Sequence, residues 1–227
     1  MSLRQFLKDR GLRKNWLKAW LYQRCIANWF LLFYSTPSKK QELVRSGDPV
    51  RYGTVLLALE QIKKEKIPGA LAECGVYTGA MSKYIHENLP DRTLYLFDSF
   101  VGFDRRDADV QNDHRFQDTS EATVLKHIGG TKNLVVRKGF FPETAAGLEA
   151  ERFSFVMIDF DKYESTLAAL RFFFPRTSPG GIIMVHDYSS PESNWACSRA
   201  LNEFLAEKTE KPVLIPDACG TALFRKI

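Results

Sequence analysis

The chain has 227 residues, of which 44% are hydrophobic and 17 are Phe, enough apolar side chains for one domain-sized core. Its formal charge of +5 is concentrated in the first 40 residues, where nine Lys or Arg face one Asp, so the remainder is slightly acidic. Four widely spaced cysteines without a C-x-x-C pair exclude a disulfide framework and a zinc knuckle. The first ten residues are too charged for a signal peptide, so we expect a cytoplasmic protein. We expect no nucleic-acid partner.

The first 40 residues predict a basic helical arm ahead of a domain over residues 41–227. Residues 15–34 are the most apolar stretch, but Lys18 and Arg24 interrupt it, and a membrane-spanning helix needs about 20 residues nearly free of charge. The stretch therefore predicts an amphipathic or buried helix that packs on the body of the protein, or on a second subunit in a homo-oligomer. Peripheral contact with the inner face of a membrane is the alternative.

From residue 50 onward, apolar segments with strand character alternate with segments of helical periodicity. Helices are expected at residues 50–66, 80–88, 163–174 and 194–208. Strands are expected at residues 70–74, 93–97, 134–137, 153–158 and 182–185, with 213–215 and 222–225 as a closing antiparallel pair. This alternation is typical of an α/β fold with a mostly parallel sheet and helices on both faces.

A glycine turn and an acidic residue stand at the ends of the first two expected strands. The first strand carries Glu73 near its tip and continues into Gly75 and Gly79, which let the backbone turn tightly and approach a ligand. Asp98 follows Gly75 by 23 residues, close to the spacing at which an acidic side chain accepts hydrogen bonds from ribose hydroxyls. Open α/β sheets bind ligands at such strand ends.

The same turn favours S-adenosylmethionine over NAD as its ligand, although both molecules present a ribose. Its pattern is Gly-x-x-x-Gly rather than the Gly-x-Gly-x-x-Gly of a pyrophosphate site, and Glu73 would repel a pyrophosphate but attract a sulfonium and an ammonium group. For the turn alone, an ordinary βα loop is the alternative. The expected cofactor-binding residues are Glu73, Gly75, Tyr77, Thr78, Gly79, Ser82, Asp98 and Ser99.

Acidic side chains also follow the fourth and fifth expected strands. Asp159 follows the fourth, and His186 and Asp187 follow the fifth, so neighbouring strands bring them to the same edge of the sheet. A divalent metal held by Asp159 and Asp187 can bind a substrate hydroxyl, stabilise the alkoxide and orient its attack on a methyl group. His186 is a candidate metal ligand, a candidate base or an orienting residue.

Asp161 lies two residues beyond Asp159 and is a candidate general base. The pattern Asp161-x-x-Glu164 is also similar to a capping box, which would make Asp161 the N-cap of the following helix. The sequence leaves both roles open, and one side chain can serve both.

These segments together resemble the macrocin O-methyltransferase family, metal-dependent enzymes that methylate sugar hydroxyls. The matching segments, within about residues 45–227, are Glu73–Gly79, Leu96–Gly102, Lys138–Thr144, Ile158–Leu170 and Leu201–Phe204. The resemblance implies a class I methyltransferase fold (Rossmann-like), Mg²⁺, and an acceptor that carries a sugar or a vicinal diol, as a small molecule or a glycoconjugate. It places the first metal aspartate on Asp159 and the base on Asp161.

The chain departs from the family pattern at two places. His186 stands where the family has the first of two Asp residues, and because imidazole suits Mn²⁺ better than Mg²⁺, Mn²⁺ is the alternative metal. The segment Asp104–His114 is strongly charged and predicts either a lid or a solvated surface loop. Trp195 and Tyr188 are candidates to line the acceptor pocket by stacking on a sugar ring, with core packing as the alternative.

The sequence thus predicts a metal-assisted O-methyltransferase that uses S-adenosylmethionine. Two other classes stay open. One is an NAD-linked or nucleotide-sugar Rossmann enzyme, and the other is a catalytically silent methyltransferase-like protein whose arm binds a partner.

Overall fold

The computed structural model describes residues 46–107 and 113–227. The chain divides into two units, Met1–Gly53 and Thr54–Ile227. The helix Pro49–Lys64 crosses this boundary, and every other element described below lies in the second unit. The expected arm over residues 1–40 lies outside the described residues. Within the described ranges, no helix is long and apolar enough to cross a membrane.

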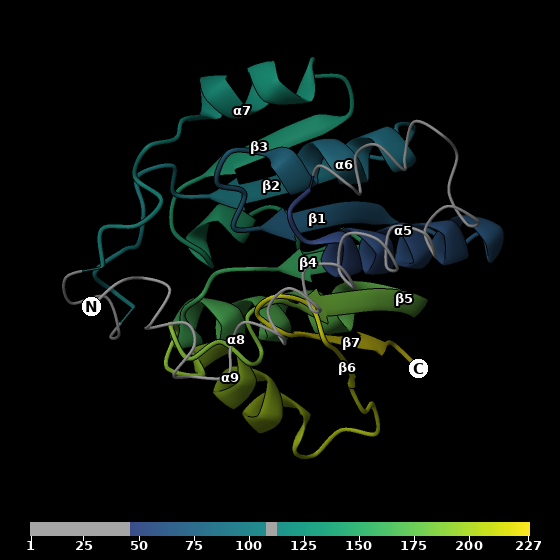
Figure 1. The fold of residues 1–227 in the computed structure, drawn as a ribbon. Helices are drawn as coiled ribbons and strands as arrows, with labels where there is room; N and C mark the ends of the chain where they lie inside the picture. The colour runs from purple at the N-terminus through teal and green to yellow at the C-terminus, as the bar shows by residue number, and fades with distance from the viewer. Residues whose placement is uncertain (1–45, 108–112) are drawn as a thin grey trace, which may run out of the picture. The chain divides into compact units, whose positions relative to one another are not determined.

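Seven strands form one sheet in the order β3-β2-β1-β4-β5-β7-β6 (Figure 1). Their bounds are β1 Ala70–Cys74, β2 Leu94–Asp98, β3 Leu134–Lys138, β4 Phe153–Ile158, β5 Thr177–Val185, β6 Val213–Ile215 and β7 Thr221–Arg225. Neighbours among β1 to β5 run parallel, whereas β7 pairs antiparallel with both β5 and β6. The predicted α/β class, with its closing antiparallel pair, is confirmed.

The helices cover both faces of this sheet. They are α5 Pro49–Lys64, α6 Ala80–Asn88, α7 Glu121–Ile128, α8 Tyr163–Phe173 and α9 Ala196–Leu205, with short 3-10 turns at Glu143–Ala145 and Phe174–Arg176. Helices α8 and α9 lie side by side on one side of the sheet (Figure 1). Because strand side chains alternate, Ala72 of β1 packs into the core on that side, whereas Glu73 points to the side of α6.

An aromatic core anchors the sheet to α8. Phe97, Phe141, Phe153 and Phe173 are each at most 2% exposed. The ring of Phe173 meets those of Phe97 and Phe153 edge-on, at centroid distances of 5.6 and 4.9 Å, which is a favourable aromatic geometry. This packing fixes β2 and β4 against α8, and so it fixes the carboxyl ends of the strands that carry the candidate site.

The structure corrects three sequence predictions. Helix α7 was not predicted, although Ser120 caps it by accepting a hydrogen bond from the backbone N–H of Thr123. Strand β5 begins at Thr177 rather than at residue 182, because a register irregularity opposite Phe153–Phe155 lets the Pro-Gly-Gly segment stay in the strand. Helix α9 begins at Ala196 rather than at residue 194, because the two preceding residues have positive φ.

Candidate active site

The glycine turn after β1 passes directly against the end of β4. Gly75 has φ +86°, and a Cβ at this position would lie 2.0 Å from the carbonyl oxygen of Asp159. The Asp159 N–H donates to the carbonyl of Cys74 at 2.7 Å, which locks the two strand ends together. Only glycine fits this position, and the fit brings the expected cofactor turn into contact with the first expected metal ligand.

Asp98, at the end of β2, organises the same turn. One carboxylate oxygen accepts hydrogen bonds from the N–H groups of Val76 and Tyr77, at 2.7 and 2.9 Å, and the other accepts from the Phe100 N–H at 2.7 Å. The sequence suggested a ribose contact for Asp98 but not this structural role. A carboxylate has further lone pairs, so the two roles are compatible.

The other expected cofactor residues lie around this turn. Glu73 and Ser82 are both buried, and the Ser82 hydroxyl donates a hydrogen bond to the Glu73 carboxylate. Gly79 stands at the cap position of α6 with φ +81°, and Thr78 precedes it in the turn. The Ser99 hydroxyl donates to the carbonyl of Gly102 at 2.5 Å within its own loop.

Tyr77, another expected cofactor-binding residue, contacts the segment that precedes α7. Its ring meets that of Phe116 edge-on, its hydroxyl donates to Asp118 at 3.3 Å, and its carbonyl accepts from the Thr119 hydroxyl at 2.5 Å. The segment before α7 therefore lies against the glycine turn. Sequence reasoning missed this contact because the partners are about 40 residues apart.

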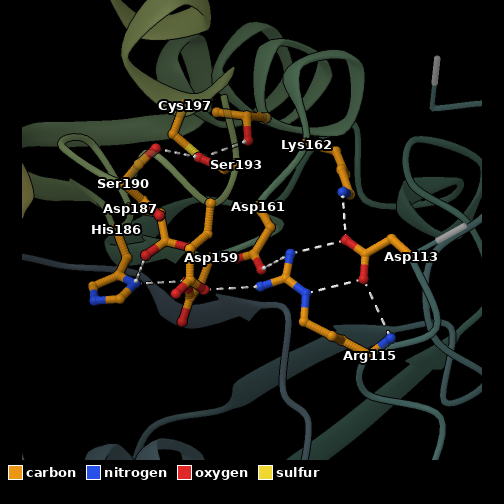
Figure 2. Close-up of polar contacts among 12 residues, drawn as sticks. Asp113, Arg115, Asp159, Asp161, Lys162, His186, Asp187, Ser190, Ser193 and Cys197 are labelled. Carbon is orange, nitrogen blue, oxygen red and sulfur yellow. Dashed lines mark hydrogen bonds and ion pairs between the residues drawn. The ribbon is translucent and has the colours of Figure 1, made fainter. Parts of the chain in front are cut away.

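The structure brings the three expected metal ligands together. One ligand atom from each of Asp159, His186 and Asp187 lies within 4.8 Å of the others. The His186 Nδ1 lies 2.9 Å from an Asp159 oxygen and 3.2 Å from an Asp187 oxygen (Figure 2). All three side chains are largely buried, and two carboxylates with an imidazole form a donor set that divalent transition metals bind.

Asp161 lies beside this cluster. Burial, a hydrogen bond to Asp187 and the nearby negative charge of Asp159 raise the pKa of Asp161 to about 9. Burial alone would raise the pKa of Asp187, but hydrogen bonds with His186 and Asp161 outweigh it and hold that pKa below its usual value. The two carboxyls therefore share one proton in the absence of a cation, with the proton on Asp161.

The cap of α8 comes from an unexpected residue. The cap position is Lys162, and its side chain makes no capping hydrogen bond. Instead, the buried Asp107 accepts hydrogen bonds from the Ser165 N–H, at 3.1 Å, and from the Ser165 hydroxyl, at 2.7 Å. The structure therefore does not support the capping interpretation of Asp161, and it leaves Asp161 available to the cluster.

The charged segment between β2 and α7 contributes a group that sequence reasoning missed. Arg115 extends its guanidinium to 3.7 Å from Asp161 while it pairs with Asp113 (Figure 2). Asp113 in turn accepts from the buried Lys162 ammonium at 2.9 Å. Residues 108–112 of the segment lie outside the described residues. The described parts on either side of this gap make the buried contacts given above, so they do not form a solvated surface loop.

The two aromatic candidates for the acceptor pocket differ in setting. Trp195 is 51% exposed and adopts a left-handed backbone conformation just before α9, so it is not a core residue. The Tyr188 hydroxyl donates to Asn202 at 3.0 Å, and its ring packs partly against the core. Of the two, only Trp195 offers a large free ring surface.

Comparisons with known proteins place the chain in a family. The family model described as Macrocin-O-methyltransferase (TylF) matches residues 50–226. Mycinamicin III 3''-O-methyltransferase from Micromonospora griseorubida is 30% identical over 167 residues, 64% of this chain and 64% of that protein. The 8-demethyl-8-(2,3-dimethoxy-alpha-L-rhamnosyl)-tetracenomycin-C 4'-O-methyltransferase from Streptomyces olivaceus is 28% identical over 172 residues, 68% of this chain and 64% of that protein. The chain thus spans slightly less than two thirds of the length of these relatives.

Solved structures share the fold. The O-methyltransferase NovP superposes with a TM-score of 0.65 at 22% identity, covering 78% of this chain and 80% of that chain. The calicheamicin methyltransferase CalS11 superposes with a TM-score of 0.61 at 22% identity, covering 76% of this chain and 78% of that chain. These likenesses confirm the predicted methyltransferase fold. Since the family model matches most of its length, the chain belongs to the macrocin O-methyltransferase family.

Proposed function

We propose that this chain is an O-methyltransferase that transfers the methyl group of S-adenosylmethionine to a sugar hydroxyl with the help of a divalent cation. The observation that carries the proposal is the contact between two sites. The glycine turn at Gly75 abuts Asp159, and Asp159 belongs to the cluster with His186 and Asp187. A methyl donor at the turn would thus lie beside a cation-binding group, as a metal-assisted transfer requires.

The turn and its surroundings would bind the methyl donor. Asp98 and the glycine turn are candidates for its ribose, and Glu73 is a candidate for its charged end. Solved proteins of the same fold are described in complex with SAM, as for the O-methyltransferase TomG, and with SAH, as for a Bacillus cereus O-methyltransferase. The bound donor would supply a methyl group attached to a positively charged sulfur.

Asp159, His186 and Asp187 would hold the cation. Their ligand atoms lie close enough for one ion, and the cluster concentrates negative charge in a buried place, so the residues fit a divalent metal. The imidazole favours Mn²⁺ relative to an all-carboxylate site, with Mg²⁺ as the alternative. When bound, the cation would supply positive charge that lowers the pKa of an acceptor hydroxyl.

Asp161 is the candidate for the general base. Its carboxyl lies at the cluster and makes no capping contact. At neutral pH its raised pKa keeps it protonated unless positive charge is added nearby, so base function requires a cation at the cluster. His186 is the second candidate, and its Nδ1 lies 2.9 Å from an Asp159 oxygen and 3.2 Å from an Asp187 oxygen.

A sugar-bearing natural product or a nucleotide sugar is the acceptor class that the relatives favour. Their names describe methylation of mycinamicin III, of a rhamnosyl tetracenomycin and of demethyldecarbamoylnovobiocin. A structural neighbour is described as a TDP-rhamnose 3'-O-methyltransferase. The roles expected for the arm, in a homo-oligomer or at a membrane face, concern residues outside the described ranges and stay predictions.

One experiment separates this proposal from an NAD-linked enzyme. Calorimetric titrations with S-adenosylhomocysteine and with NAD, each with and without Mn²⁺, identify the ligand of the turn. Formation of S-adenosylhomocysteine is then measured with mycinamicin III, TDP-rhamnose and demethyldecarbamoylnovobiocin as acceptors. We expect binding of S-adenosylhomocysteine and cation-dependent product with at least one sugar acceptor. Saturable NAD binding without S-adenosylhomocysteine binding would refute the proposal.

A further inference from the structure

We propose that Arg115 is a positioning residue that keeps Asp161 out of the ligand set of the cation. This inference rests on the proposed function, because it assumes that a cation binds Asp159, His186 and Asp187 while Asp161 serves as the base. It explains how four neighbouring side chains could divide into three ligands and one base.

Asp161 has polar partners on two sides. On one side it makes a hydrogen bond to Asp187, a member of the cluster. On the other side the Arg115 guanidinium lies 3.7 Å from its carboxylate. Asp161 is almost completely buried, so once a bound cation has displaced its proton, its ion pair with Arg115 is stronger than a pair at the surface. Among the described residues, Arg115 is the only Lys or Arg in a salt bridge with Asp161.

Arg115 itself is held firmly by its own segment. Its Nε and Nη2 donate to the two carboxylate oxygens of Asp113 at 2.9 and 2.8 Å, which is a two-point contact with fixed geometry. Lys162 donates to the same carboxylate at 2.9 Å, so Asp113 is tied to the residue next to Asp161. These contacts hold the pKa of Asp113 well below its usual range. The Asp113–Arg115 ion pair, called the clamp below, therefore stays ionised.

The arrangement has a physical consequence for cation binding. A carboxylate next to three ligands would ordinarily turn toward a divalent cation and join its coordination shell, because carboxylates are strong ligands for such ions. The ion pair with Arg115 opposes this turn, and the positive charge of the guanidinium repels the incoming cation. Both effects weaken cation binding, and the first also leaves the Asp161 carboxylate free to accept a proton from the acceptor hydroxyl.

The chain contains a matched control for this clamp. Arg106 donates to both oxygens of Asp104, two residues earlier, at 2.8 Å each, which repeats the geometry of Asp113 and Arg115. Its third partner, however, is the exposed Glu143 at 3.0 Å rather than a residue of the cluster. Replacing Arg106 therefore removes an equivalent clamp from the same segment without touching Asp161.

The test is a double-mutant cycle on Mn²⁺ affinity, measured by electron paramagnetic resonance of free Mn²⁺. The proteins are wild type, R115M, D161N and R115M/D161N, with R106M as the control. We expect R115M to bind Mn²⁺ about tenfold more tightly than wild type, since a third carboxylate becomes available as a fourth ligand. In the D161N background the same substitution should change the Mn²⁺ affinity by about twofold or less, because the gain in affinity requires the Asp161 carboxylate. R106M should bind like wild type.

Thermal melting confirms that each variant folds, and Arg115→Gln replaces R115M if the methionine variant does not. Unchanged or weaker Mn²⁺ binding by the folded Arg115 variant would overturn the inference. An equal gain in Mn²⁺ affinity in the wild-type and D161N backgrounds would also overturn it. The gain would then come from removing the charge of Arg115 and not from releasing Asp161. Equal Mn²⁺ binding by wild type and R115M leaves the proposed methyl transfer standing. Absence of Mn²⁺ binding in wild type would remove the cation site and, with it, this inference.

Discussion

At the scale of single residues, the proposed cation site depends on side chains that stand one to three positions beyond a strand. Asp159, Asp161 and Asp187 were foreseen because sequence adjacency to an apolar strand fixes where a residue must lie. Arg115 was not foreseen, because it reaches the cluster from a long connection whose path has no periodic pattern. Local patterns locate residues on strands, whereas contacts made by long loops depend on tertiary packing.

Gly75 offers the most local test of the contact between the two sites. Gly75→Ala should destabilise the protein by more than the backbone strain of about 1–3 kcal/mol, because its Cβ would meet the Asp159 carbonyl at 2.0 Å. Gly147→Ala is the control, since its φ of +82° is similar but no atom lies within 4 Å of its Cβ. Urea unfolding measures both changes. Equal losses of stability would contradict the packing described for Gly75.

Asp161 gives a pH-dependent prediction. Its folded pKa is raised from 3.8 to about 9, so the native protein without metal loses stability relative to the unfolded chain as the pH rises between these values. Asp161→Asn cannot ionise and should escape this loss. In the presence of a chelator, the Tm of the variant should exceed that of wild type by an amount that grows from pH 5 to pH 9 and reaches roughly 3–10 °C.

The exposed Asp91 provides the control for this experiment. Asp91→Asn should give a Tm difference from wild type that changes little with pH. A difference between Asp161→Asn and wild type that stays constant from pH 5 to pH 9 would show that Asp161 does not hold a proton in the folded protein.

At the scale of elements, the strands were predicted better than the connections. Strands β1, β4 and β6 have the predicted bounds. For β1 and β4 the reason is that largely apolar runs mark strands that are buried in a sheet, whereas β6 is a mostly exposed edge strand. Helix α7 was missed because it is short and buries only Val124 and Ile128, too few residues for a clear apolar stripe. Capping of α8 was one of the two roles predicted for Asp161, because a capping residue normally stands just before the helix that it caps.

The actual cap leads to a prediction about α8. Asp107→Ala should destabilise the protein by about 1–3 kcal/mol, because it leaves the buried Ser165 N–H and hydroxyl without their partner. Ser120→Ala, which removes the exposed cap of α7, should cost about 1 kcal/mol or less. Chemical denaturation compares the two variants. A smaller loss for Asp107→Ala than for Ser120→Ala would contradict the buried cap.

At the scale of the whole molecule, the sheet topology follows from rules that a sequence displays. Alternating strands and helices require parallel neighbours, and the short final strands separated by a turn require an antiparallel pair. The rules do not predict that the segment before α7 contacts Tyr77 through Phe116 and Thr119.

The central claim is that Asp159, His186 and Asp187 form one cation site beside the methyl-donor turn. Electron paramagnetic resonance of Mn²⁺ with wild type and Asp159→Asn, combined with calorimetric titration by S-adenosylhomocysteine, tests it most directly. We expect one Mn²⁺ per wild-type chain and loss of this binding in Asp159→Asn, while S-adenosylhomocysteine binds both proteins. Equal Mn²⁺ binding by the two proteins would contradict the claim.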